Sequence, residues 1–189
     1  MILPIVTYGH PVLRQKGATI TEITPEITQL IADMQETMVD ANGLGLAAQQ
    51  VAKELQLTVI DVTGVTDRPS TLEIDGKEVD PESLMPLVLM NPEVTPLNDP
   101  VAGPEGCLSF PELYADITRP EKVEVKGMNE KGEQLHFICG GLLARAVQHE
   151  TDHLNGILFI DRMSKSAKKK LKPDLDALLY ETKREMGIR

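Results

Sequence analysis

The sequence predicts an α+β fold in which antiparallel and mixed β-sheets pack around a central helix that carries two histidines. Two observations favour this class. The segments expected as strands do not alternate regularly with the expected helices, and residues 123–137 have the pattern of an antiparallel hairpin. A doubly wound parallel sheet would instead require strands and helices in regular alternation.

The first expected helix covers residues 25–41. Thr24 can cap it through its side-chain oxygen, and Pro25 suits the first helical position. Its apolar stripe consists of Ile27, Leu30, Ile31, Met34 and Met38. The pair Asn42-Gly43 then ends the helix.

The middle of the chain is expected to form strands. Residues 55–62 are largely apolar and β-branched, and residues 87–90 form a short strand bounded by prolines. The polar residues 63–86 between them predict an excursion with a loose hairpin rather than a linker between domains. Apolar residues alternate with polar ones on both sides of the turn at residues 129–132, which predicts an antiparallel hairpin.

Two further helices are expected. Residues 142–155 present a buried face, and Asn155-Gly156 ends that helix. The buried face consists of Leu142, Leu143, Ala146, Val147 and Leu154. From about residue 165 the chain is expected to be helical again, with an interruption at Pro173.

Length and composition bound the organisation. A chain of 189 residues suits one compact domain over residues 1–189, with its C-terminal helix from about 165. Hydrophobic residues make up 41% and charged residues 25%, as in ordinary globular proteins. The net charge of −10 argues against specific nucleic-acid recognition, since nucleic-acid binding needs positive charge.

The sequence has no sign of export or membrane insertion. No apolar run approaches the roughly 20 residues that span a bilayer, and the N-terminus lacks the basic and apolar regions of a signal peptide. We therefore expect a cytoplasmic protein without membrane contact. The only cysteines, Cys107 and Cys139, do not make a disulfide framework, and a reducing cytosol disfavours a bond between them. Cys139 continues the apolar phase of its strand and is expected to be buried.

The strongest chemical signal is His149-Glu150-Thr-Asp-His153. Histidines four residues apart on a helix lie on one face, close enough to bind one metal ion. The adjacent Glu150 is placed to act on a water molecule at that ion, as in HExxH hydrolases. The alternative is a pair of surface histidines, but the flanking apolar residues place this face towards the core. Buried histidines without a partner are costly.

A hydrolytic metal site needs a third protein ligand and an open position. No histidine follows His153, and Glu181 and Glu185 lie at the far end of the last helix. Cys107 is the best remaining candidate, because a thiolate binds iron and zinc strongly. Gly106 allows close approach of the backbone there, and Pro111 is expected to end the segment.

A third motif is Gly43-Leu-Gly-Leu-Ala-Ala-Gln-Gln50. It lacks the lysine and the spacing of a phosphate-binding loop. Its glycines would let a ligand backbone approach closely, and Gln49 and Gln50 offer amide donors. The segment alone is equally compatible with a buried turn that has no role.

Together the three motifs resemble those of peptide deformylases, which read G-x-G-L-A-A-x-Q, E-G-C-L-S and H-E-x-x-D-H in this order. Here they stand as Gly43–Gln50, Glu105–Ser109 and His149–His153. The resemblance extends from residue 2 to about residue 164. It implies removal of the formyl group from the formyl-methionine of newly made polypeptides, with release of formate.

The resemblance also implies roles for individual residues. Cys107, His149 and His153 correspond to the metal ligands, and Glu150 to the general acid and base. Gln50 and the backbone N–H of Leu108 correspond to the oxyanion hole. The substrate-binding residues implied are Leu44, Gly45, Gly106, Leu142, Arg145 and Ala146. The implied cofactor is one divalent ion, usually Fe²⁺, which Zn²⁺, Ni²⁺ or Co²⁺ can replace.

Two departures from the family pattern concern the surroundings of the site. Residues 63–86 look longer than in compact members, and Tyr114 stands where many members have arginine.

We also expect Asp152, which lies on another face of the helix from the ligands, to pair with Arg119. A solvated Asp152 is the alternative.

The basic residues within 162–172 have two interpretations. They consist of Arg162, Lys165, Lys168, Lys169, Lys170 and Lys172. Such a run is ordinarily a solvated helix face. A contact with the ribosome is the alternative, because formyl-methionyl nascent peptides emerge there.

Two other functions compete with this interpretation. A zinc endopeptidase would account for the HExxH motif but not for Gly45 or Cys107. A structural metal module or an inactive binding protein would not require Glu150, which is not a ligand. The Glu150→Gln variant separates these functions, since it should keep the metal and lose turnover.

Overall fold

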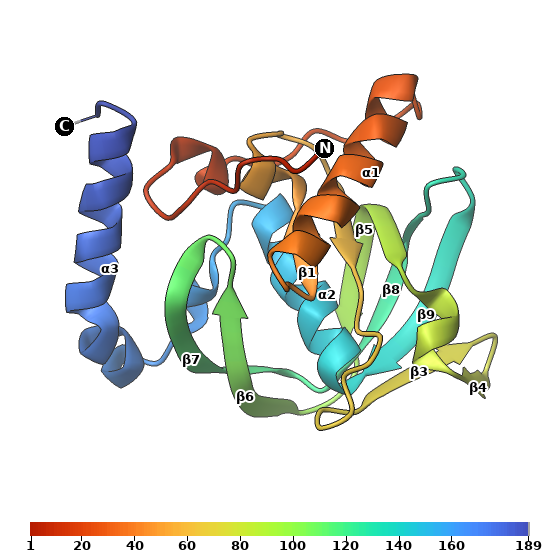
Figure 1. The fold of residues 1–189 in the computed structure, drawn as a ribbon. Coiled ribbons are helices and arrows are strands. Elements are labelled where there is room, and N and C mark those ends of the chain that lie inside the picture. The colour runs from red at the N-terminus through yellow and green to blue at the C-terminus, as the bar shows by residue number, and fades with distance from the viewer. Residues whose placement is uncertain (189) are drawn as a thin grey trace.

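The computed structural model describes residues 1–188 and has the α+β architecture that the sequence predicts (Figure 1). The helices are α1 (Pro25–Asp40), α2 (Gly141–Leu154) and α3 (Lys165–Glu185), with short 3₁₀ helices at Pro11–Arg14, Ala48–Val51, Pro81–Leu84 and Phe159–Arg162. The strands are β1 (Gly45–Ala47), β2 (Leu57–Ile60), β3 (Ser70–Ile74), β4 (Lys77–Val79), β5 (Leu87–Pro96), β6 (Pro100–Cys107), β7 (Phe110–Pro120), β8 (Lys122–Met128) and β9 (Gln134–Gly140).

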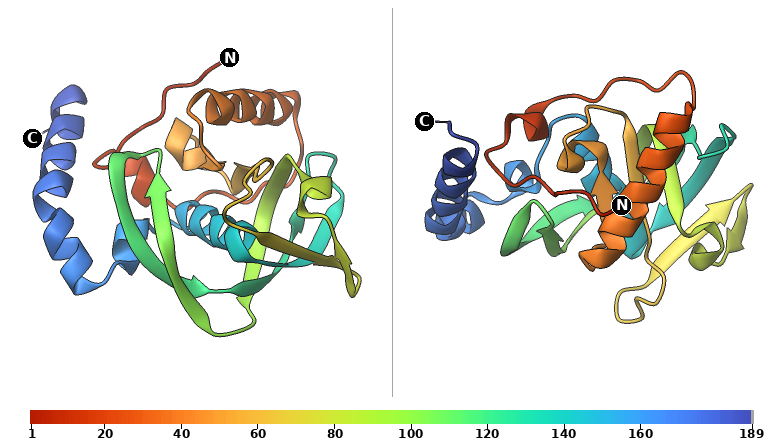
Figure 2. Two further views of the ribbon diagram at one scale, coloured as in Figure 1. Left: turned by 60° about the horizontal axis from the view of Figure 1, so that its bottom comes forward. Right: turned by 45° about the horizontal axis from the view of Figure 1, so that its top comes forward.

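The strands form two sheets around α2. A seven-stranded sheet has the order β1-β2-β5-β8-β9-β3-β4, and β6 pairs with β7 in a separate hairpin. All pairs of these strands are antiparallel, and a single parallel bridge joins Ala18 to Leu55. Figures 1 and 2 show α2 in the middle of the molecule, between the large sheet and the β6–β7 hairpin. Side chains from α2 therefore meet both sheets.

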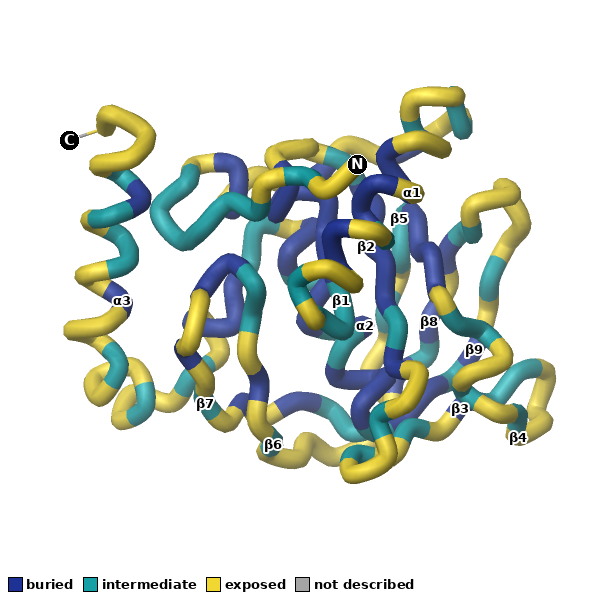
Figure 3. Tube along the Cα trace, in the orientation of Figure 1, coloured by how far each residue is buried: buried dark blue, intermediate teal, exposed yellow. Residues whose placement is uncertain are grey.

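Three apolar clusters make up the core. One joins α2 to the large sheet around Leu143 and Val125, and a second packs α1 against β2 and β5 around Met34. The third lies under β7 around Phe110 and includes Leu175 of α3. Figure 3 shows α2 and the central strands mostly buried, whereas α3 exposes most of its length.

Several expected elements form where the sequence places them. Helix α1 begins at Pro25, and Thr24 caps it by accepting a hydrogen bond from the Ile27 N–H. Helix α2 covers residues 141–154, and β8 and β9 form the expected hairpin. Cys139 is 1% exposed, and both cysteines are free. Within residues 1–188, no helix has the length and apolar character needed to cross a membrane.

The excursion at residues 63–86 contains the expected hairpin and also extends the large sheet. Strands β3 and β4 pair with each other, and β3 pairs with β9. Strand β5 is longer than the expected 87–90, because it continues past Pro92 to Pro96. An irregularity between Met90 and Glu93 permits this, since it takes the proline out of the regular ladder.

Two expectations about prolines were wrong. Helix α3 continues through Pro173, whose exposed position lets water solvate the carbonyl that loses its partner. Pro111 lies inside β7 and does not end the segment. Strands β6 and β7 were not expected at all. Prolines are tolerated there because each strand of a two-stranded sheet has one free edge.

Candidate active site

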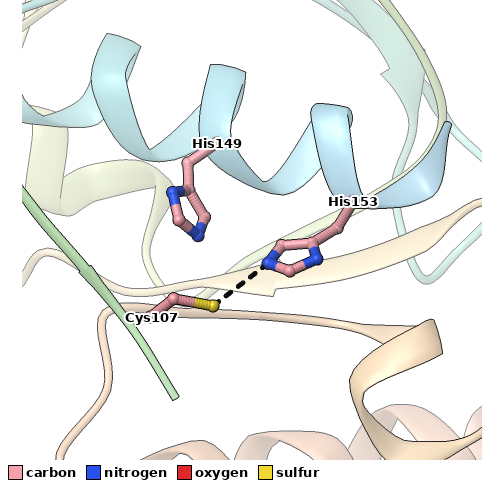
Figure 4. Close-up of side chains that lie close together, drawn as sticks. All are labelled: Cys107, His149 and His153. Carbon is pink, nitrogen blue, oxygen red and sulfur yellow. Dashed lines mark hydrogen bonds between the residues drawn. The ribbon is translucent and has the colours of Figure 1, made fainter. Parts of the chain in front are cut away.

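Three potential metal ligands meet at the centre of the molecule. Cys107 ends β6, and His149 and His153 are one turn apart on α2 (Figure 4). One ligand atom from each residue lies within 4.8 Å of the other two, and the Cys107 Sγ is 3.3 Å from the His153 Nε2. The spacing on α2 and the bulge that follows Gly106 bring these donors to one point. A thiolate with two imidazoles fits a divalent ion of the iron or zinc type.

Both histidines are buried, at 8% and 1% exposure, as the flanking apolar residues predicted. Burial lowers the pKa of His149, but hydrogen bonds to Cys107 and Glu105 outweigh it, and the net pKa lies above the ordinary value. Burial lowers the pKa of His153 well below its ordinary value, which favours the neutral imidazole that binds metals. The surroundings of the two imidazoles therefore shift their pKa values in opposite directions.

Glu105 orients His149 and is the main residue whose role the sequence did not reveal. Its Oε1 accepts a hydrogen bond from the His149 Nδ1 at 2.8 Å, which leaves the Nε2 free for a metal. The same carboxylate accepts two hydrogen bonds from Arg119 and one from Arg145. Burial raises the pKa of Glu105, but the hydrogen bonds to His149 and Arg119 lower it to about 2. The carboxylate is thus ionised in the interior.

Glu150 is buried beside the ligands. It is 4% exposed, and burial raises its pKa to about 7. Its Oε1 is 3.8 Å from the His149 Nε2, and its buried Oε2 has no hydrogen-bond partner among residues 1–188. A carboxyl group with a pKa near neutral can both accept and return a proton. The unpartnered oxygen is therefore available to a water molecule or a substrate.

Gln50 is held with its amide group towards Cys107. Its Oε1 accepts a hydrogen bond from the Ala47 N–H, and its Nε2 donates to the Ser109 Oγ at 3.2 Å and to the Cys107 Sγ at 3.6 Å. Leu108 lies between these two partners in the chain. The neighbouring Gln49 has a different role, because it donates to the carbonyls of Gln15 and Leu154 and joins loops.

A cavity of about 370 Å³ opens beside Glu150. Its wall includes Gln50, Cys107, Leu108, His149 and Glu150 as well as Leu44, Gly45, Gly106, Leu142, Arg145 and Ala146, so it contains all of the candidate site residues except His153. His153 is the most deeply buried of the three ligands. Strand β1 is an edge of the large sheet, and β6 is an edge of the hairpin. Both edges can accept an added strand.

Two residues at the cavity extend what the sequence indicated. Tyr114 lines it and lies against Gly106, where an added Cβ would be 2.6 Å from the Tyr114 Cε1. Arg68, from the excursion at residues 63–86, also lines it and donates to the Pro104 carbonyl at 2.9 Å. The Arg145 guanidinium is occupied by Glu105 and by the carbonyls of Ile117 and Val101.

The expected pair of Asp152 and Arg119 is confirmed, with an Nη1–Oδ2 distance of 2.9 Å. Asp152 has a second partner that the sequence did not indicate, Arg162. These three residues border a second cavity of about 420 Å³, on another face of α2 from the ligands. The ion pairs on this side connect to Glu105 through Arg119.

Comparisons with known proteins agree with this geometry. A model of the polypeptide deformylase family matches residues 2–169. The chain is 43% identical over 185 residues to a peptide deformylase of Opitutus terrae, covering 97% of this chain and 96% of the relative. It is 45% identical over 178 residues to one of Methylacidiphilum infernorum, covering 94% and 93%.

A solved structure is also similar. The crystal structure of a peptide deformylase from Synechococcus elongatus in complex with actinonin superposes with a TM-score of 0.75 at 37% identity, covering 99% of this chain and 87% of that one. The matches extend over nearly the whole sequence, and the family model spans the positions of all the candidate site residues. The chain therefore belongs to the peptide deformylase family.

Proposed function

We propose that Cys107, His149 and His153 hold one divalent metal ion and that Glu150, Gln50 and Leu108 carry the hydrolysis of a formyl group. Peptide deformylases remove the N-formyl group from newly made polypeptides in a metal-dependent reaction. One observation supports these assignments above all. The three ligand atoms gather within 4.8 Å beside Glu150, and Cys107, His149 and Glu150 line a cavity that lies between two free strand edges.

The proposed binding step uses those edges. The backbone of Leu44 and Gly45 on one side and of Gly106 on the other pairs with the substrate as an added strand. Leu142, Ala146 and the aliphatic part of Arg145 form the apolar wall that receives the methionine side chain. This arrangement brings the formyl carbon to the metal ligands and Glu150.

The proposed chemical step divides the work between side chains. When bound, the divalent ion supplies Lewis acidity, which lowers the pKa of water and polarises the formyl oxygen. Glu150 accepts the proton of the attacking water and then donates it to the leaving amine, while formate departs. The Gln50 amide and the Leu108 N–H donate hydrogen bonds to the formyl oxygen as negative charge develops there.

Fe²⁺ is the ion we propose for the cell, with Zn²⁺, Ni²⁺ or Co²⁺ as substitutes. A thiolate and two neutral imidazoles form a soft donor set that accepts all of these ions. The free thiol of Cys107 also fits a reducing compartment, and we propose a cytoplasmic location. Helix α3 packs through Leu175 onto the cluster around Phe110, which supports one catalytic domain over residues 1–189.

We keep the ribosome contact of residues 162–172 as a second part of the proposal. The five lysines of this segment are exposed, and all of them lie in the first half of α3. Cosedimentation with ribosomes tests it. The triple variant Lys168→Glu, Lys169→Glu and Lys170→Glu should lose affinity, whereas unchanged affinity would leave these lysines as a solvated face.

Formate release from a formyl-Met-Ala-Ser peptide tests the reaction. The protein is prepared anaerobically with Fe²⁺ and compared with its Glu150→Gln variant. We expect fast release by the parent, none by the variant, and equal metal content in both. Absence of release by a metal-loaded parent would contradict the proposed substrate, and an active variant would contradict the role of Glu150.

A further inference from the structure

Arg162 begins a chain of ion pairs that leads from the surface to a metal ligand. It is the last residue of the 3₁₀ helix Phe159–Arg162, two residues before Ser164, which caps α3. Its Nε and Nη2 donate to the two oxygens of Asp152 at 2.6 and 2.9 Å. The Arg162 side chain is 44% exposed, whereas that of Asp152 is 13% exposed. Arg162 therefore covers Asp152 from solvent.

The chain continues inwards through buried groups. Arg119, whose side chain is 3% exposed, donates its Nη1 to Asp152 at 2.9 Å. It also donates its Nε and Nη2 to the two oxygens of Glu105 at 2.6 and 2.9 Å. Glu105 in turn accepts the Nδ1–H of His149. Every link is a charge-assisted hydrogen bond, and two of the three ion pairs are bidentate, which restrains orientation as well as distance.

This connection matters because Arg119 holds both carboxylates at once. Without Arg162, Asp152 would lose two of its three charge-assisted hydrogen bonds and would face the second cavity. Its carboxylate could then turn towards water, and Arg119 would follow or lose a partner. Either change would weaken the restraint that the bidentate hydrogen bonds of Arg119 place on the Glu105 carboxylate. The orientation of the His149 ring, which is hydrogen-bonded to that carboxylate, would then be less fixed.

We propose that Arg162 is a positioning residue for the metal site, which acts on His149 through Asp152, Arg119 and Glu105. The inference rests on the proposed role of His149 as a metal ligand. It assigns Arg162 a function separate from the lysines of the same basic segment. The Arg162 guanidinium binds Asp152 and so helps to retain the metal, whereas the lysines are exposed to solvent.

The molecule offers a closely matched control in Arg14. Its Nη1 and Nη2 donate to the two oxygens of Asp161 at 2.6 and 3.1 Å, and its side chain is 45% exposed. Asp161 otherwise accepts a hydrogen bond from the Leu158 N–H, and within the described residues it forms no hydrogen bond or ion pair with Arg119, Glu105 or His149. Arg14 also donates to the Gly156 carbonyl at 3.3 Å. Arg14 thus matches Arg162 in chemistry and exposure, and its ion pair lacks the connection to the ligands.

The rate of metal release tests the proposal without measuring turnover. Zn²⁺-loaded parent, Arg162→Ala, Arg162→Lys and Arg14→Ala are mixed with an excess of a chromophoric chelator. Loss of a group that directly supports a ligand typically costs 10–100-fold in affinity. Because Arg162 acts through further groups, we expect release from Arg162→Ala to be about 3–10-fold faster. Arg14→Ala should change it less than about twofold, and Arg162→Lys should lie between parent and alanine.

Thermal unfolding of the metal-free proteins separates positioning from general stability. Both alanine variants should lose some stability, since each loses one bidentate ion pair of a half-exposed arginine. Equal release rates for Arg162→Ala and Arg14→Ala would overturn the inference, as would a release rate that follows the loss of stability in both. A parent protein that binds no metal would overturn the proposed function as well. If the parent binds metal and releases formate, and Arg162→Ala releases its metal at the parental rate, only the role of Arg162 is overturned.

Discussion

The backbone of Gly45 lies directly against the carboxyl group of Glu150. A Cβ at Gly45 would be 2.9 Å from both the Cγ and the Cδ of Glu150, and 3.0 Å from its Oε1. The glycine is therefore required by close approach between β1 and α2. It keeps the proposed general base in a single position beside the ligands, at the edge where the substrate is proposed to bind.

The first prediction concerns the Gly45→Ala variant. The added methyl group should push the Glu150 side chain away from its position, because contacts under 3.0 Å cannot be maintained. A misplacement on the order of 1 Å can cost about 100-fold in rate. We expect kcat to fall at least about tenfold with unchanged metal content, measured by formate release and by metal analysis. Full activity in this variant would show that the position of Glu150 is not critical.

The second prediction is that Glu150→Gln stabilises the metal-free protein at alkaline pH. The pKa of Glu150 is about 7 in the folded protein, against 4.5 as its ordinary value. The folded state therefore holds this proton where the unfolded state releases it, and stability falls as pH rises from 4.5 to 7. Removing the carboxyl should recover up to about 3 kcal/mol at pH 8 and little at pH 4.

Urea unfolding of both metal-free proteins at several pH values measures this difference. A difference that does not depend on pH would contradict the raised pKa. A bound cation is expected to lower the pKa of Glu150, since a nearby positive charge favours the carboxylate. The pH dependence should therefore become smaller in the Zn²⁺-loaded proteins.

The third prediction separates two adjacent glutamines. Gln50→Ala should lower kcat by about 10²–10³ with nearly unchanged metal binding, because one hydrogen-bond donor to the developing charge is lost. It should also lower the free energy of unfolding, because the buried Ala47 N–H loses its acceptor. Gln49→Ala should lower the free energy of unfolding with a nearly unchanged kcat, because a fully buried side chain loses its hydrogen bonds to the Gln15 and Leu154 carbonyls. Steady-state kinetics distinguishes the two variants, and urea unfolding measures the loss of stability in each. Similar kinetic losses in both variants would contradict the proposed oxyanion role.

The fourth prediction concerns Glu105→Gln. The substitution leaves Arg119 and Arg145 without their shared carboxylate in the interior, which should cost about 3–5 kcal/mol of unfolding free energy. The pKa of Glu105 is about 2, below its ordinary 4.5, so its contribution is complete above pH 4.5 and is lost as pH falls through 2. The gap between parent and variant should shrink over that range in urea unfolding. A constant gap would show that the charge of Glu105 is not what stabilises the fold.

The fifth prediction is that the Fe²⁺ form is sensitive to oxygen. A half-buried thiolate beside iron is open to oxidation. The half-life of formate release should be shorter in air than under nitrogen for the Fe²⁺ form, and equal in both for the Zn²⁺ form. Equal lifetimes of the Fe²⁺ form would contradict this expectation.

Much of the fold could be predicted because local patterns and tertiary packing agree. Thr24 and Pro25 mark the beginning of α1, and residues 129–132 mark the turn between β8 and β9. The β6–β7 hairpin could not be predicted, because Pro100, Pro104 and Pro111 weaken any strand pattern. These prolines are tolerated only because both strands have a free edge, which is a property of the assembled hairpin.

The candidate site likewise contains residues that could be predicted from the sequence and residues that could not. The spacing of His149 and His153 on a helix, the exclusion of other third ligands in favour of Cys107, and the pairing of Asp152 with Arg119 all followed from the sequence. Glu105 could not be predicted to support His149, because nothing local indicates that a glutamate two residues before a cysteine contacts a histidine on another element. Arg162 could not be distinguished from the neighbouring lysines, because its partner Asp152 lies on another element.

By itself, the sequence determined the fold class, the family and the candidate residues of the site. The periodicity of α2 and three short motifs suffice for these, since each depends on residues close together in the chain. Only the tertiary structure decided which charges meet. Burial makes an unpaired ion costly, so Glu105, Arg119 and Asp152 must be satisfied by groups that the fold brings from distant segments.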